Sequence, residues 1–117
     1  MLTSLVPKVF YVDLRVGIDL FGDGIGMSVL HRDEHLAVLA RDHAKVYVVE
    51  DAEYAAKDRP ELAIETDDIE AVFADITSRR SDLLHPNLAR ITCQPWGMRE
   101  FALRDAANVC VVFRDWS

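Results

Sequence analysis

The sequence predicts an α+β protein built from two βαβββ modules in series. Each half of the chain has one strand-like run, one helix-compatible segment and then three more strand-like runs. The two helices open alike, at Val12-Asp13-Leu14 and Asp67-Asp68-Ile69, and one hairpin segment recurs as Leu39-Ala40-Arg41-Asp42 and Ala102-Leu103-Arg104-Asp105. Half-units of about 50 residues cannot each bury a sheet face alone, so we expect them to share one core.

The first module is expected to span residues 1–50. β-Branched and aromatic residues with Pro7 near their start predict a strand over 5–12, where one backbone amide is not needed. Asp13 occupies the N-cap position of a short helix that Gly17 weakens. The remaining strands of this module are predicted over 27–31, 36–40 and 45–49.

A polar stretch over 51–59 is expected to link the modules, and the second module is expected to span 60–117, so that the whole chain 1–117 forms a single domain. A strand is predicted over 62–65. Asp67 or Asp68 then caps an amphipathic helix, whose apolar residues recur at i, i+3, i+4 and i+7: Ile69, Val72, Phe73 and Ile76. The last three strands are predicted over 88–92, 101–103 and 109–113.

Composition limits the classes of partner and the compartment. The 117 residues carry a formal net charge of −7, which disfavours nucleic acid and favours a cationic ligand. Cys93 and Cys110 form neither a disulfide framework nor a CxxC pair. We find no secretory signal pattern and no run approaching the roughly 20 apolar residues of a membrane span. We therefore expect a cytoplasmic protein without a membrane partner.

The segment Pro95-Trp96-Gly97 precedes a strand of the second module. Proline fixes φ and glycine frees the backbone two residues later, so Trp96 is held on a short corner. An indole held in this way either fills a core or forms one wall of a binding slot.

Several segments resemble one known family. The run Gln94-Pro95-Trp96-Gly97, followed by Arg99-Glu100-Phe101-Ala102-Leu103-Arg104-Asp105 and Cys110, is similar to a signature of bleomycin resistance proteins. The loop Leu84-His85-Pro86-Asn87 resembles a member of the same group, and Phe21 and Gly26 follow Asp13 at the expected spacing. Paired βαβββ modules are characteristic of the glyoxalase/bleomycin resistance/dioxygenase (vicinal oxygen chelate) superfamily.

The resemblance implies a half-open cleft of mixed β-sheet, completed by a homodimer in which the first strand can be exchanged. It further implies a non-catalytic protein without cofactor that binds and sequesters a planar, cationic antibiotic of the bleomycin type and so confers resistance. Trp96 matches the indole that stacks on the bithiazole of the drug. The partner aromatic of the family falls at Leu36, so one aromatic wall would become aliphatic.

Other residues are expected to line the slot, although strand alternation lets only one parity face inward and the sequence leaves that parity open. Glu61 falls at a vestigial metal position, where it would either meet a cationic group of the ligand or be a solvated charge at a strand end. With Trp96, the expected ligand-binding residues are Leu36, Val38, Tyr47, Glu61, Asn87, Met98 and Arg99.

The main alternative is a metal-dependent enzyme of the glyoxalase or dioxygenase type. The superfamily's metal positions fall at Val6, Glu61, Val112 and Tyr47 or Val48, of which only Glu61 is a ligand type. The four histidines are expected at strand ends, turns and a loop, and Cys110 lies in an apolar strand. We therefore expect neither a metal nor a catalytic residue. A self-protection or carrier role in antibiotic biosynthesis is the remaining alternative.

Overall fold

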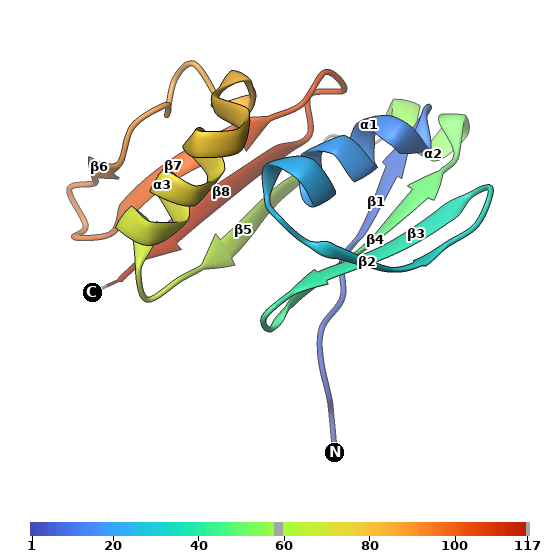
Figure 1. Cartoon of the computed structure of the whole chain (residues 1–117), viewed down its shortest axis with the longest axis horizontal. Coiled ribbons are helices and arrows are strands. Elements are labelled where there is room, and N and C mark those ends of the chain that lie inside the picture. Colours follow the sequence, from blue (N-terminus) through green and yellow to red (C-terminus); the bar gives the residue numbers. More distant parts are fainter. Residues whose placement is uncertain (58–59, 117) are drawn as a thin grey trace. The chain divides into compact units, whose positions relative to one another are not determined.

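The computed structural model describes residues 1–57 and 60–116, and these form two compact units, Met1–Asp58 and Arg59–Ser117 (Figure 1). Each unit contains a four-stranded mixed sheet, with strand order β1-β4-β3-β2 in the first and β5-β8-β7-β6 in the second. The prediction of an α+β protein with two βαβββ modules is therefore confirmed.

The two sheets have the same internal pairing. In the first unit β1 pairs with β4 in parallel, and β3 lies antiparallel between β4 and β2. The elements are β1 (Lys8–Tyr11), α1 (Leu14–Ile18), the π-helical turn η1 (Asp19–Gly24), β2 (Ser28–Arg32), β3 (Leu36–Arg41), β4 (Ala44–Glu50) and α2 (Ala52–Lys57).

In the second unit β5 pairs with β8 in parallel, and β7 lies antiparallel between β8 and β6. The elements are β5 (Glu61–Glu65), α3 (Ile69–Arg80), the 3₁₀ turn η2 (Ser81–Leu83), β6 (Thr92–Cys93), β7 (Arg99–Arg104) and β8 (Cys110–Asp115).

Matching carboxylates cap the helices of both units. Asp13 accepts a hydrogen bond from the Arg15 amide, and Asp68 accepts one from the Ala71 amide. A second carboxylate, at the end of the strand paired with β1 or β5, reaches the first helical amide: Glu50 accepts from Leu14, and Asp115 accepts from Ile69. The repeat thus extends from topology to individual helix caps.

Three details differ from the sequence-based predictions. Strand β1 begins at Lys8 rather than at residue 5, and the predicted strand over 88–92 is wrong except at Thr92. The chain from residue 85 to β6 contacts β7 only at separate points: Ala102 donates to the Leu88 carbonyl and accepts from the His85 amide. The predicted linker contains α2. Asp51 caps the start of this helix by accepting hydrogen bonds from the amides of Glu53 and Tyr54. Residues 58 and 59 of the linker lie outside the described residues.

Helix α1 packs closely on the first sheet. Gly17 is buried there, and a Cβ atom at this position would lie 2.5 Å from Val48 Cγ1 and 2.6 Å from Tyr11 Cε2. The covered face of this sheet holds side chains with almost no solvent exposure, namely Val9, Tyr11, Ala37, Leu39, Val46 and Val48. The opposite face is only half-buried, so β1, β3 and β4 each have one core-forming and one open parity, whereas β2 is exposed throughout. No described helix is long and apolar enough to cross a membrane.

Candidate functional site

Trp96 lies at the tip of the hairpin between β6 and β7. The Gln94 amide donates to the Met98 carbonyl at 2.8 Å, and the Gly97 amide donates to the Gln94 carbonyl at 2.9 Å. Gly97 has φ 92°, a left-handed value that favours glycine. The tight turn leaves the Trp96 side chain 61% exposed, so the indole does not fill the core of its unit.

A buried carboxylate supports this hairpin from the sheet. Glu100 accepts from Gln94 Nε2 at 2.8 Å and from Arg114 Nε at 3.1 Å, so both of its oxygens have a donor. Glu100 is only 7% exposed. The network therefore ties the base of the Trp96 turn to β7 and β8 and limits its movement.

The structure brings three of the predicted slot residues together on the first sheet. Val38 pairs with Tyr47, and two residues away along both strands Leu36 pairs with Val49. Paired residues point to the same face, so Leu36, Val38 and Tyr47 share the open face, opposite the face covered by α1. The register therefore shows which parity of these strands faces away from α1.

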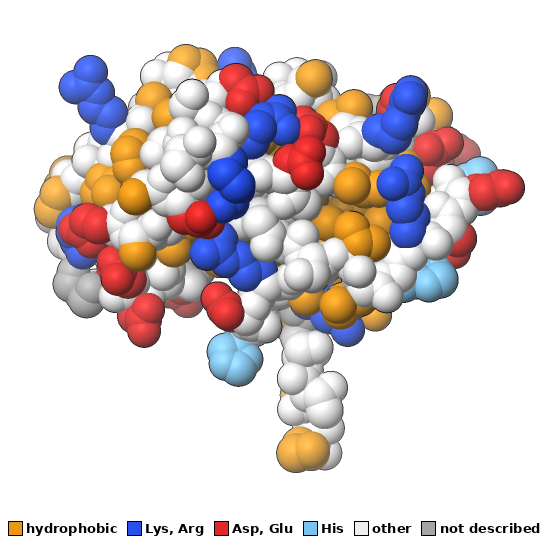
Figure 2. Space-filling model, in the orientation of Figure 1, with side chains coloured by type: hydrophobic (Ala, Val, Ile, Leu, Met, Phe, Trp, Pro, Cys, Tyr) orange, Lys and Arg blue, Asp and Glu red, His pale blue; other side chains and the backbone are white. Residues whose placement is uncertain are grey.

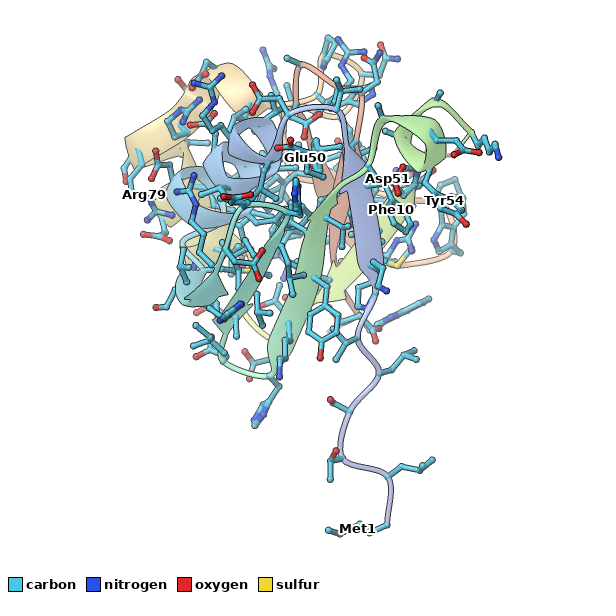
Figure 3. All side chains as sticks on the ribbon, turned by 90° about the vertical axis from the view of Figure 1, so that its right-hand side faces the viewer. Met1, Phe10, Glu50, Asp51, Tyr54 and Arg79 are labelled. Atoms are coloured by element: carbon cyan, nitrogen blue, oxygen red, sulfur yellow. The ribbon has the colours of Figure 1, made fainter. Side chains whose placement is uncertain are left out.

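Sequence reasoning missed two aromatic residues on this unit. Phe10 pairs with Val49 and so lies on the same open face as Leu36. Tyr54 of α2 stacks on Phe10 with ring centroids 5.0 Å apart and an interplanar angle of 27° (Figure 3). Strand alternation could have indicated that Phe10 lies on this face. Tyr54 was not predicted because its helix was assigned to a linker.

The predicted residues of the second unit do not converge on one face. Arg99 has the parity of Phe101, whose ring contacts Phe73 of α3, so Arg99 faces the helix side of the sheet. There its guanidinium bonds to Glu70 and to Asp115. Arg99 is thus an ion-pair partner that connects β7, β8 and the first turn of α3, rather than a free cation.

Met98, Asn87 and Glu61 occupy three further environments. Met98 is 5% exposed, and Asn87 is exposed in the turn after His85, whose Nδ1 accepts from the Asn87 amide. Glu61 is exposed at the start of β5 and pairs in register with Cys110.

Two electrostatic effects bear on chemistry in this unit. The hydrogen bond from Arg99 lowers the pKa of Glu70 below its ordinary value, which keeps this carboxylate ionised. Burial, assisted by the negative charge of Glu61, raises the pKa of the Cys110 thiol. A thiol with a raised pKa is a poor nucleophile at neutral pH, which favours a structural role for Cys110.

The donor set does not fit the divalent metal that enzymes of the resembled superfamily hold. No group of three or more His, Cys, Asp or Glu side chains suited to a metal occurs within residues 1–57 and 60–116. The face of the sheet that carries Glu61 also carries Cys110, Arg104 and, two residues along β8, the buried Val112. A guanidinium and a valine beside a single carboxylate oppose cation binding rather than complete a ligand set.

Comparison with solved structures assigns the fold. The chain is similar to the bleomycin-binding protein from bleomycin-producing Streptomyces verticillus complexed with copper(II)-bleomycin, with 23% identity, a TM-score of 0.74 and 97% of each chain covered. It is also similar to TioX from Micromonospora sp. ML1, with 18% identity, a TM-score of 0.80 and coverage of 98% and 99% of the two chains.

A lactoylglutathione lyase from Agrobacterium tumefaciens is similar at 14% identity and a TM-score of 0.71, with coverage of 97% of this chain and 93% of that one. No family model matches the sequence, and no curated protein sequence matches it. The chain therefore shares its fold with a bleomycin-binding protein and with a lactoylglutathione lyase.

Proposed function

We propose that this protein binds and sequesters a planar, cationic antibiotic of the bleomycin type without transforming it. The observation that carries the proposal is the exposed Trp96 ring, held at the tip of a Pro-Trp-Gly hairpin in a fold shared with bleomycin-binding proteins. A rigid, accessible indole loses little conformational freedom when a flat heteroaromatic ring stacks on it.

The charge balance supports a cationic ligand. The chain carries a net charge of −7, and a field of this sign attracts a cationic tail over distances longer than a direct contact. The proposal includes a homodimer that binds the ligand at its interface, with Leu36, Val38 and Tyr47 as apolar contacts. It assigns no catalytic role to any side chain.

Titration with metal-free bleomycin, followed by calorimetry and tryptophan fluorescence, tests the proposal. We expect saturable binding that Trp96→Ala weakens by about two- to tenfold, the equivalent of one aromatic stacking contact. Trp96→Phe should retain part of the affinity because it keeps a π face. Absence of both binding heat and a tryptophan fluorescence change with the wild-type protein would refute the proposal, and a stoichiometric divalent metal in protein purified without added metal would favour an enzyme instead.

A further inference from the structure

The second tryptophan of the chain lies at the same end of the second sheet as Trp96. Arg99 pairs with Asp115 in the last register position of β7 and β8, so Trp116, the residue after Asp115, follows β8 at the end of the sheet where the Trp96 hairpin enters β7. Figure 1 shows the end of β8 at the same edge of the sheet as the start of β7. Trp96 and Trp116 are 61% and 62% exposed, so this edge of one unit presents two accessible indoles.

A carboxylate on the neighbouring strand holds the second ring. Trp116 Nε1 donates a hydrogen bond to Glu65 Oε2, and Glu65 pairs in register with Arg114, two residues before Trp116. A charge-assisted bond restricts rotation of an otherwise exposed side chain. Trp116 is therefore held by Glu65, as Trp96 is held by its turn.

The surroundings of these two rings are acidic. Strand β5 ends beside β8 at this edge, and α3 begins there, so carboxylates from several elements gather near the indoles. The carboxylates at this end of the sheet lie on both of its sides. Glu70 and Asp115 pair with Arg99 on the helix side, and Glu65 and Glu100 share the opposite face with Arg114, so four carboxylates and two guanidinium groups leave a formal charge of −2. Such an edge favours a cation over an anion or a neutral ring.

We propose that Trp116 is a second aromatic contact for the planar cationic ligand, with Glu65 orienting its indole and supplying a carboxylate to the ligand cation. This inference rests on the proposed function and deepens it, because it names a recognition residue outside the Pro-Trp-Gly segment. It supplies a second π surface in a chain that has leucine at position 36, where the resemblance implies an aromatic partner.

Single-tryptophan variants test the assignment, because the chain has two tryptophans. Trp96→Phe leaves Trp116 as the sole indole emitter. With metal-free bleomycin we expect ligand to protect the Trp116 emission from acrylamide, a short-range collisional quencher. Trp116→Ala should weaken binding by about two- to tenfold, and Glu65→Gln by a smaller factor, because the indole keeps a neutral acceptor while the charge is lost. Val12→Ala, a substitution at a 68% exposed apolar residue of the first unit, is the matched control and should bind like the wild type.

The outcomes separate the two proposals. Failure of the wild-type protein to bind would overturn the proposed function and this inference together. Binding by the wild type, with unprotected Trp116 emission and unchanged affinity of Trp116→Ala, would overturn this inference alone. If circular dichroism shows that Trp116→Ala is unfolded, the acrylamide experiment on the Trp96→Phe protein tests the inference. Protection of Trp116 by the ligand would support it, and absence of protection would overturn it.

Discussion

Gly17 is the residue at which α1 and the first sheet come closest. Alanine is the better helix former by about 1 kcal/mol, which alone predicts a gain in stability from Gly17→Ala. The added Cβ would however lie 2.5 Å from Val48 Cγ1, inside van der Waals contact, and overpacking of this kind costs about 1–3 kcal/mol. We expect the cost of this steric overlap to exceed the gain in helix propensity. Gly17→Ala should therefore lower the urea concentration at the midpoint of unfolding.

Gly22 offers a control with the same chemical change. A Cβ at Gly22 would meet Leu39 Cδ2 at 3.6 Å, an ordinary contact distance. Gly22→Ala should therefore be neutral or slightly stabilising through its effect on the unfolded chain. Equal destabilisation by both substitutions would show that backbone conformation, rather than contact with Val48 and Tyr11, makes glycine necessary at position 17.

Residue chemistry also explains why the candidate site was only partly predictable. The Pro-Trp-Gly spacing indicated a fixed indole at Trp96, and the structure places its ring in solvent. Nothing local in the sequence showed that Arg99 would pair with Glu70 and Asp115, because these partners are brought together by the pairing of β7 with β8 and by the start of α3. Contacts of this kind depend on register, which one strand alone does not encode.

At the scale of elements, the start of α3 provides a test of the helix caps. The sequence left Asp67 and Asp68 as alternative caps, and in the structure Asp68 Oδ1 accepts from the Ala71 amide at 3.1 Å. We expect Asp68→Ala to lower the free energy of unfolding by about 1 kcal/mol, the usual cost of a lost N-cap. Asp67→Ala should change it by less than about 0.5 kcal/mol, as for other exposed positions. The reverse order in urea denaturation would contradict this assignment.

The elements that the sequence predicted well are those with a clear apolar period. Helix α3 has four apolar residues at helical spacing, and β3, β4 and β8 have short apolar runs. Helix α2 has no such period. It is capped by Asp51 and carries an i,i+4 ion pair between Glu53 and Lys57, so its polar composition resembled that of a linker. The prediction for the segment before β6 was wrong for the opposite reason. Its apolar residues indicated a strand, but the segment contacts β7 without forming a continuous ladder of hydrogen bonds.

At the scale of the whole molecule, the N-terminal arm exposes hydrophobic side chains. Met1, Leu2 and Leu5 are 112%, 100% and 96% exposed, and the arm extends away from β1 with Met1 at its end (Figure 3). The hydrophobic tip of the arm is also visible in Figure 2. Exposed apolar side chains on an extended segment gain free energy when a second copy covers them.

We therefore expect a homodimer whose association depends on this arm. Light scattering coupled to size-exclusion chromatography should give the dimer mass for the full chain and a shift toward monomer for a chain that lacks residues 2–5. Leu2→Ser with Leu5→Ser should shift the equilibrium in the same direction without shortening the chain. A monomeric full-length protein would contradict the dimer, and a dimer unaffected by both changes would assign the interface to other surfaces.

The net charge of −7 gives a second prediction for the whole molecule, on the rate of ligand association. Acidic and basic side chains are interspersed on the face shown in Figure 2, so attraction of a cation arises from the overall excess of carboxylates rather than from one uniform patch. Such attraction is screened as the Debye length falls from roughly 30 Å at 0.01 M to roughly 3 Å at 1 M salt. We expect stopped-flow association of a cationic bleomycin-type ligand to slow by about tenfold or more over this range, while its dissociation changes little.

A bithiazole fragment without the cationic tail is the control, and its association should not depend on salt. Equal salt dependence of both ligands would show that the cationic tail does not determine the rate of encounter.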